Sequence, residues 1–343
     1  MALDRKNLAT LAKAVAKANP SASTNFSFEG ESFSYSDLND TLRYELNELA
    51  GTYPKYRENK NTIFQILEET IDDVLPQRVL QQYGQFAEIK TIAQGDKAIF
   101  TQKITAASKR RAKQFITKVG LAGIYEVFKL DGKSYEVPTS AFGGAAQIGF
   151  EEFLDGRVDF VDVLDIVMEG LDECVYLEIE RALKGAVSSL QSANKYSGAG
   201  FSEAEMDRLI QVADAYGNAT IYCTYEFAAT MIPDQNWVSD AMKDQKWNNG
   251  YLGNYKGHRV IVLNQSFEDD TNSTKVIDPA YAWIIPTGGN DKPVKVAFEG
   301  QTIVNEFVNR DLSREIQVYK KLGVGAIITN NICVYVNTSL KQS

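Results

Sequence analysis

The feature that most constrains this fold is a single apolar stripe between residues 156 and 192. Apolar side chains recur there at steps of three and four: Phe160, Leu164, Val167, Leu171, Val175, Ile179, Ala182, Ala186 and Leu190. This spacing predicts one continuous helix over 156–192. At 1.5 Å per residue the helix is roughly 55 Å long, about the width of a compact protein of this size. We therefore expect an elongated molecule with this helix as its spine, and Gly170 and Gly185 allow a bend in it.

The spine helix is acidic, whereas a segment that precedes it is basic. Residues 151–195 hold four basic and eleven acidic side chains, a net charge of −7. Several of the acids keep to the faces away from the apolar stripe: Asp155, Asp159, Asp162, Glu169, Glu173 and Glu180. Residues 87–120 hold eight basic and two acidic side chains, a net charge of +6, in a chain whose total is −9. This opposition of charge needs an explanation.

The basic residues lie on a predicted β excursion. From about Phe86 to Gly149 the pattern is typical of strands, and residues 125–137 carry Asp131-Gly132 at their centre. Asp-Gly between alternating runs favours a tight hairpin, because Gly adopts the positive φ that the turn needs. The basic run therefore occupies one arm of an extended β segment, which returns through the Gly-Ala-rich stretch AFGGAAQIG.

The remaining pattern predicts a mixed α+β protein. Amphipathic helices are expected at 3–18, 32–50 and 61–82, with a break at Pro20 after the first. After the spine, Ser202-x-x-Glu205 matches a capping box that opens a helix ending near Gly217. Strands are expected at Ala219–Thr224 and His258–Leu263, a helix at Tyr225–Ile232, and further strands between Val294 and Val336.

The composition is typical of a folded protein, and the cysteines fit folding in a reducing compartment. The hydrophobic content is 44% and the charged content is 24%, which is ordinary for a folded protein. Cys174, Cys223 and Cys333 are far apart and odd in number, so they give neither a disulfide framework nor a metal-binding spacing. No run approaches the ~20 apolar residues that cross a bilayer, and we expect a soluble protein with no membrane partner.

Chemistry-bearing motifs are weak, and the sequence predicts no enzyme. His258 is the only histidine and begins an apolar strand, so a structural role is favoured over that of a catalytic base. Ser192-x-x-Lys195 resembles the motif of acylating serine enzymes without its companion signatures. Glu268-Asp269-Asp270 lacks the glycine and the closing Glu of a calcium loop. We expect no catalytic residue, no metal and no cofactor.

The basic run suits a protein surface better than nucleic acid. Nucleic-acid sites interleave aromatic residues in a basic domain, but only Phe100 and Phe115 lie near this run. A charge match between protein surfaces fixes register and steers encounter. The basic arm then either reaches the acidic spine of a neighbouring copy or folds back on its own spine.

The order of these elements resembles the major capsid proteins of tailed double-stranded DNA bacteriophages, whose shell fold is shared with encapsulins. The resemblance covers nearly the whole chain. It includes the stretches NATIYCTYEFAATMI and GNYKGHRVIVLN, and the closing FVNRDLSREIQVYKKLGVGAIITNNICVYV. It implies an N-terminal arm at 1–60 and an extended β E-loop at 87–150. It further implies P-domain helices, including the spine, at 61–86 and 151–199, an α/β A-domain at 200–295, P-domain strands at 296–327, and a return to the A-domain at 328–343.

The resemblance also implies a function. The chain would be a head protein that self-assembles into hexamers and pentamers of an icosahedral shell enclosing DNA without sequence-specific binding. The implied intersubunit contacts are basic E-loop residues (Lys103, Lys109, Arg110, Arg111 and Lys113) against acidic spine residues (Asp155, Asp159, Asp162, Glu169 and Glu173). Some relatives crosslink a loop lysine to an asparagine; here Lys103 or Lys113 would pair with Asn305, Asn309 or Asn330.

Further partners follow from the same resemblance. They are a scaffolding protein, a portal, and decoration or head-completion proteins, and the location is the virion after assembly in the host cytoplasm. An encapsulin-like nanocompartment is the alternative function, and a soluble hydrolase or carbohydrate-binding protein is the more distant one.

Overall fold

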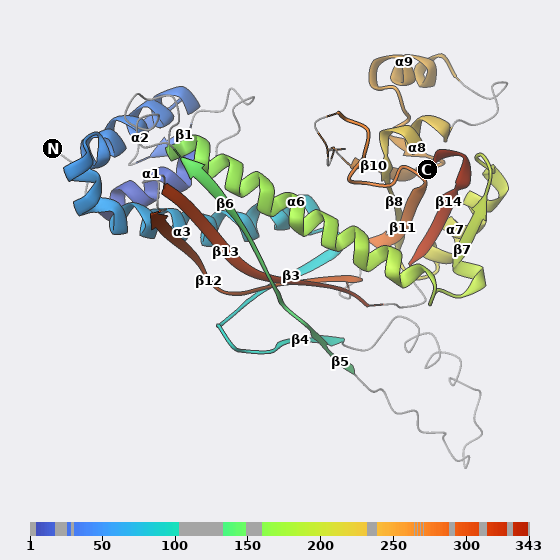
Figure 1. The fold of residues 1–343 in the computed structure, drawn as a ribbon. Coiled ribbons are helices and arrows are strands. Elements are labelled where there is room, and N and C mark those ends of the chain that lie inside the picture. The colour runs from blue at the N-terminus through green and yellow to red at the C-terminus, as the bar shows by residue number, and fades with distance from the viewer. Residues whose placement is uncertain are drawn as a thin grey trace, which may run out of the picture.

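The protein is elongated, with two lobes bridged by one long helix (Figure 1). The computed structural model describes residues 5–17, 26–28, 31–102, 133–148, 160–231, 239–263, 265, 267, 269, 271–287, 292–308, 314–327 and 332–341. Helix α6, Phe160–Val187, runs from a helical and β lobe at one end to an α/β lobe at the other. The mixed α+β class predicted from the sequence is confirmed.

The spine helix ends earlier than predicted. Its apolar stripe is buried as expected at Leu171, Val175 and Ile179, but α6 ends at Val187, before the predicted end at 192. Ser188 and Ser189 follow, and the Ser188 hydroxyl donates to the Gly185 carbonyl. Serine competes with the helix by such local bonds, which explains the early end. Residues 156–159 of the predicted helix lie outside the described residues.

Three helices form the far end of the molecule. Helices α1 (Arg5–Lys17), α2 (Tyr35–Ala50) and α3 (Tyr53–Tyr83) pack together, next to the short antiparallel pair β1 (Phe26–Phe28) and β2 (Glu31–Phe33). Helix α1 buries Leu8, Leu11 and Val15. Helix α2 begins at Tyr35 and not at 32, because a capping box at Ser34 and Asp37 fixes its start. Helix α3 begins earlier than predicted, at Tyr53, with a proline in its first turn.

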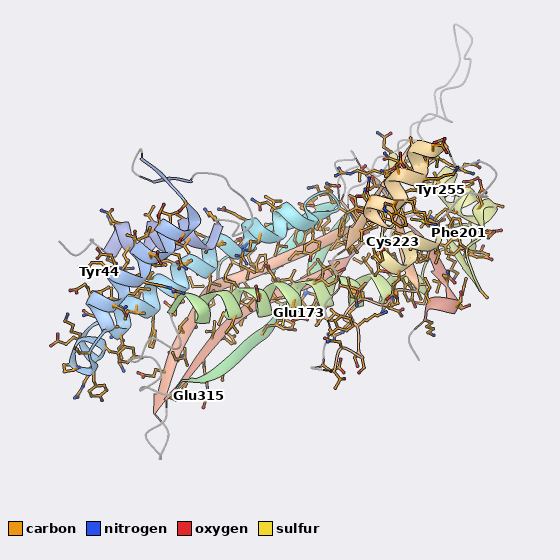
Figure 2. All side chains as sticks on the ribbon, turned by 90° about the horizontal axis from the view of Figure 1, so that it is seen from above. Tyr44, Glu173, Phe201, Cys223, Tyr255 and Glu315 are labelled. Atoms are coloured by element: carbon orange, nitrogen blue, oxygen red, sulfur yellow. The ribbon has the colours of Figure 1, made fainter. Side chains whose placement is uncertain are left out.

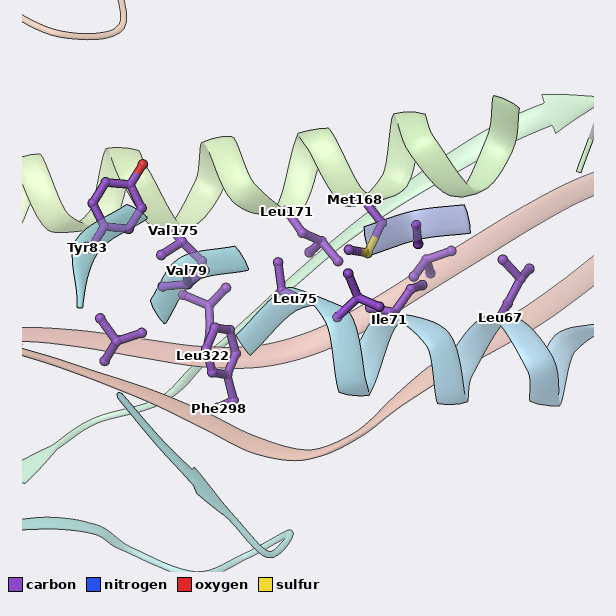
Figure 3. Close-up of a cluster of buried hydrophobic side chains, with 14 of the residues drawn as sticks. Leu67, Ile71, Leu75, Val79, Tyr83, Met168, Leu171, Val175, Phe298 and Leu322 are labelled. Atoms are coloured by element: carbon purple, nitrogen blue, oxygen red, sulfur yellow. The ribbon is translucent and has the colours of Figure 1, made fainter. Parts of the chain in front are cut away.

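The spine and α3 share one apolar interface (Figure 3). Leu67, Ile71, Leu75 and Val79 recur every fourth residue on α3 and point toward α6. Met168, Leu171 and Val175 meet them from α6, and Phe298 and Leu322 close the cluster from the sheet beneath. Side chains four apart lie on one face of a helix, so both helices present continuous rows to each other.

A four-stranded sheet supports these helices in the order β3-β12-β13-β6. Its strands are β3 (Ala87–Ile92), β6 (Ser140–Ile148), β12 (Val294–Val308) and β13 (Arg314–Ala326). Strand β3 runs parallel to β12, whereas β13 is antiparallel to both β12 and β6. A separate antiparallel pair, β4 (Ala98–Gln102) and β5 (Lys133–Val137), lies within the predicted β excursion. Its predicted Asp131-Gly132 turn lies outside the described residues.

The second lobe holds a mixed six-stranded sheet in the order β7-β14-β11-β8-β10-β9. The strands are β7 (Lys195–Gly198), β8 (Asn218–Thr224), β9 (Asn254–Tyr255), β10 (His258–Leu263), β11 (Tyr281–Thr287) and β14 (Cys333–Asn337). The helices are α7 (Glu203–Asp214), α8 (Tyr225–Thr230) and α9 (Asp240–Asn249). The strands predicted at 219–224 and 258–263 are confirmed, and the helix predicted at 225–232 ends at Thr230.

The capping box predicted at Ser202 and Glu205 is wrong. Ser202 occupies the N-cap position of α7, but its side chain makes no capping bond. Its backbone N–H instead donates to the Tyr335 hydroxyl at 2.7 Å, and the Glu205 carboxylate accepts from Arg208 at 2.8 Å. A contact from the distant strand β14 therefore replaces the local one that the motif predicts.

Two carboxylates of α3, Asp72 and Glu68, bond to the edge of β12, and we call this contact the carboxylate seam. Strand β3 pairs with β12 only as far as Glu299, where a bulge interrupts the register. Beyond it, Asp72 accepts from the Thr302 N–H at 3.0 Å, and Glu68 accepts from the Val304 N–H at 2.9 Å. Four helical residues rise about 6 Å and two strand residues about 6.8 Å, so the two spacings match. The helix thus satisfies an edge that β3 leaves open.

A buried lysine completes this seam. Lys320 on β13 is 1% exposed, and its ammonium donates to Asp72 at 2.5 Å and to the Gly300 carbonyl at 3.0 Å. A buried charge is tolerated only when a counterion and hydrogen bonds compensate for its lost hydration. Asp72 therefore holds together α3, β12 and β13.

We expect Asp72→Ala to destabilise the subunit by about 3–5 kcal/mol, because it leaves the Lys320 ammonium buried without its counterion. The measurement is the free energy of unfolding in urea for dissociated subunits. The neighbouring Asp73→Ala is the matched control, since Asp73 is half exposed and forms a surface ion pair with Lys13; its loss should cost less than about 1 kcal/mol. Equal effects of the two substitutions would contradict the role of the seam.

Candidate functional site

The motifs weighed as catalytic occupy structural positions. His258 lies on β10, where its Nδ1 is 3.3 Å from the Ala219 carbonyl and its Nε2 is 3.5 Å from Asp214. Lys195 is a paired residue of β7, and Ser192 opens a 3-10 turn. Within the described residues, no group of His, Cys, Asp and Glu side chains could hold a metal ion, and no helix there has the length and apolarity to cross a bilayer.

The strand pair β4–β5, which we call the root of the β excursion, packs against β12. Phe100 on β4 is 1% exposed and packs in a small core with Ala98, Val137 and Ala297. The Lys295 ammonium lies 5.8 Å from the Phe100 ring centre and pairs with Glu88. A cation over an aromatic face is attracted by the ring quadrupole, more strongly when desolvated. Strands β4 and β5 are therefore fixed to β12 at their base.

A glycine on β13 lets the chain between β5 and β6 pass close to that strand. A Cβ added at Gly323 would lie 2.3 Å from the Pro138 carbonyl oxygen, closer than real Cβ contacts come. Gln102 and Lys133 are directly paired at the outer end of β4 and β5. Residues 103–132 therefore leave and rejoin the described structure at one point.

The predicted basic contact residues all belong to that segment. Lys103, Lys109, Arg110, Arg111 and Lys113 lie outside the described residues, so their contacts stay predictions. Of the asparagines named for a crosslink, Asn305 is exposed on β12, whereas Asn309 and Asn330 lie outside the described residues.

The acidic partners are described only in part. Asp155 and Asp159 lie outside the described residues, and Asp162 belongs to α6 without a described side chain. Glu169 is exposed and Glu173 is half-buried, one helical turn apart on α6. Figure 2 labels Glu173 on this helix. Side chains at i and i+4 share a helix face, so the structure brings these two of the five predicted acids together.

An apolar groove runs along the same stretch of α6, lined by residues that follow these two glutamates in sequence, and sequence reasoning missed it. It holds about 280 Å³ between α6 and the strands β6 and β13, and its walls include Gly144, Gly170, Cys174 and Val318. Ile166 on its wall is 67% exposed. Glycine at 144 and 170 leaves open space where a side chain would otherwise stand. The signal in the sequence was the Gly-Gly-Ala run of β6 facing a helix that carries Gly170.

One carboxyl of α6 is buried against α3. Burial raises the pKa of Asp172 to about 6, although the Arg78 guanidinium 3.8 Å away lowers it in part. Among the residues that the structure describes, one Asp172 oxygen has no hydrogen-bond partner. Arg78 also donates to the Ala16 carbonyl at 2.9 Å, so the pair links α1, α3 and α6.

Comparison with known proteins gives a family match over almost the whole chain. Residues 7–336 match the family described as "SPbeta prophage-derived putative capsid protein YonB". No curated protein sequence matches the chain.

Solved structures share the fold at low identity. The capsid of a native GTA particle is 10% identical, with 74% of this chain and 89% of that chain covered and a TM-score of 0.50. The Microbacterium phage Oxtober96 chain is 8% identical, with coverages of 73% and 89% and a TM-score of 0.49. The SrpI encapsulin of Synechococcus elongatus PCC 7942 is 10% identical, with coverages of 76% and 89% and a TM-score of 0.46.

The spine helix, the four-stranded sheet and the six-stranded lobe give the chain the fold of capsid shell subunits. The chain belongs to the YonB capsid protein family, and it is a major capsid shell protein. The resemblance noted in the sequence is confirmed. The family indicates a structural rather than an enzymatic role.

We expect the stability of the wild type, relative to Asp172→Asn, to rise as the pH falls from 8 to 5. The folded pKa of Asp172, about 6, lies above the ordinary value near 4. Ionised Asp172 is therefore unfavourable in the folded state above pH 6, and this cost disappears on protonation. Between pH 8 and pH 5 the difference between the two proteins should change by about 1.5 kcal/mol, because the cost disappears in full only below pH 4, where the unfolded chain is protonated as well. Urea unfolding at several pH values measures it, with Glu169→Gln as the control for removing one exposed carboxylate. A constant difference between wild type and Asp172→Asn would contradict the assignment.

Proposed function

We propose that copies of this chain form hexamers and pentamers that close an icosahedral shell around double-stranded DNA. The family match over residues 7–336 carries this proposal. Solved capsids of this fold are assembled shells, which supports self-assembly. A scaffolding protein, a portal and decoration or head-completion proteins would take part in assembly in the host cytoplasm, and the finished shell would be part of the virion.

The proposed contact between copies joins the basic 103–132 segment to the acidic spine of a neighbour. Figure 1 shows the β4–β5 root on the far side of β12 and β13 from α6, which favours contact with another copy over folding back. Glu169 and Glu173 supply negative charge on the stretch of α6 whose Gly170 and Cys174 line the apolar groove. The segment carries both basic and apolar side chains, among them Arg110, Arg111 and Phe115. Such a contact combines steering by charge with burial of apolar surface.

The overall negative charge supports a shell that encloses DNA without binding its phosphate groups tightly. The chain has a net charge of −9, whereas tight binding of phosphate groups requires clustered lysine and arginine. In this proposal the basic side chains at 103–120 contact the acidic surface of a neighbouring copy and not DNA. The contents of purified particles decide between a phage head and the encapsulin-like alternative, because the first encloses DNA and the second encloses a protein cargo.

We expect the double substitution Arg110→Glu and Arg111→Glu to leave a folded subunit that forms few or misshapen shells, because like charges then face each other at the contact. Circular dichroism tests folding, and negative-stain electron microscopy counts shells. The same change at Lys55 and Arg57 of α3 serves as the control and should leave assembly intact. Normal particles from the Arg110 and Arg111 variant would remove this contact from the proposal.

A crosslinking experiment separates contact between copies from folding back. One tagged chain carries Arg111→Cys and a differently tagged chain carries Glu173→Cys, both with Cys174→Ser. Oxidised particles should contain a disulfide that joins the two tags. A disulfide that forms only within a chain carrying both changes would support folding back instead.

A further inference from the structure

We infer that helix α9, with Trp247 at its centre, is a second contact surface between neighbouring copies of this chain. This inference rests on the proposed self-assembly and concerns a different surface from the groove and spine contact.

Helix α9 is well specified locally. The Ser239 hydroxyl accepts from the Met242 N–H at its start. Gly250 ends it in the left-handed conformation at φ 78° and donates its N–H to the Lys246 carbonyl at 2.7 Å. A Cβ added at Gly250 would lie 2.0 Å from the Tyr225 hydroxyl, so glycine is required there on two counts. Both ends of α9 therefore have defined signals.

The described part of the chain leaves α9 almost uncovered. None of its ten residues is buried. Met242 and Gln245, one turn apart, are half-buried and face the body, while Trp247 is 90% exposed. In Figure 1 the helix stands at the outer tip of the α/β lobe, beyond α8. Isolated helices of this length are marginal in water, because tertiary packing supplies most helical stability.

A second exposed aromatic side chain lies at the end of α9. Tyr225, which touches Gly250 at the end of α9, is 51% exposed and packs edge-on against Tyr251 at 6.2 Å. Single exposed apolar residues are ordinary, but a tryptophan exposed on an uncovered helix that ends against a half-exposed tyrosine is not. Tryptophan and tyrosine are the residues that most often dominate the energy of protein interfaces.

The charges of α9 favour a second copy as the occupant. Its charged residues are Asp240, Asp244, Lys243 and Lys246, which sum to zero, and Lys243 pairs with Asp240 at 2.9 Å. Copies that each carry a net charge of −9 repel one another, so a neutral aromatic surface is where they approach at least cost. The balance also disfavours nucleic acid, which requires an excess of positive charge beside stacking aromatics. In a closed ring every copy presents this surface once.

The test compares wild type with Trp247→Ala and Trp247→Phe during assembly of the full-length chain. We expect Trp247→Ala to raise the protein concentration at half-assembly about tenfold or more, as loss of an interface hot spot does, and Trp247→Phe to have a smaller effect. Tyr44→Ala, which removes a 65% exposed aromatic on α2 at the other end of the molecule, is the matched control. Sedimentation measures assembly, and circular dichroism confirms folding of each variant.

Fluorescence gives an independent measurement. The difference between wild type and Trp247→Phe isolates the emission of Trp247, which should shift to shorter wavelength and become protected from acrylamide on assembly. Wild type that assembles while Trp247 stays accessible, with Trp247→Ala assembling normally, would overturn this inference alone. A Trp247 shift produced by added DNA without assembly would also overturn it. Wild type that never assembles would instead contradict the proposed function.

Discussion

The structure depends on the way α3 satisfies the open edge of β12. After the bulge at Gly300, β12 no longer pairs with β3, and its outward N–H groups at Thr302 and Val304 bond to carboxylates of the helix. Backbone groups buried without a partner cost several kcal/mol in an apolar environment. Because these groups are satisfied by side chains of α3, the helix has a fixed position along the strand. The apolar rows of α3 are then correctly placed to receive the spine helix α6.

Aromatic packing then connects the two lobes. Tyr83 at the end of α3 lies 5.6 Å from Tyr176 of α6, and Phe86 lies 4.7 Å from Tyr222 of the six-stranded sheet. The void among these rings is only about 30 Å³, so the lobes meet in a nearly filled interface. Glu180 of the spine adds a hydrogen bond from the Asp278 N–H at 2.9 Å. Packing of this density resists relative motion, and the subunit is built to behave as one body.

A rigid subunit suits a shell whose contacts are individually modest. Association of two copies loses translational and rotational freedom, and like charge opposes it. Closure of a ring or shell repeats each contact many times, so the whole resists dissociation although each contact is weak. The surfaces that we propose for these contacts are the groove along the spine, the exposed face of α9 and the segment 103–132.

The sequence by itself determined the elements whose signals are local. The stripe of α6, the strands at Ala219 and His258 and the α+β class follow from the spacing of apolar residues, which a chain of this composition must bury. Only the tertiary structure decided the rest. The bond from Ser202 to Tyr335 replaced a local capping box, Asp72 met Lys320, and β3 paired with β12, all between residues more than a hundred positions apart. The groove likewise formed where two glycines from separate elements came to face each other. Periodicity records which face of an element is buried, but the partner of that face is set by packing among distant segments, which no local pattern encodes.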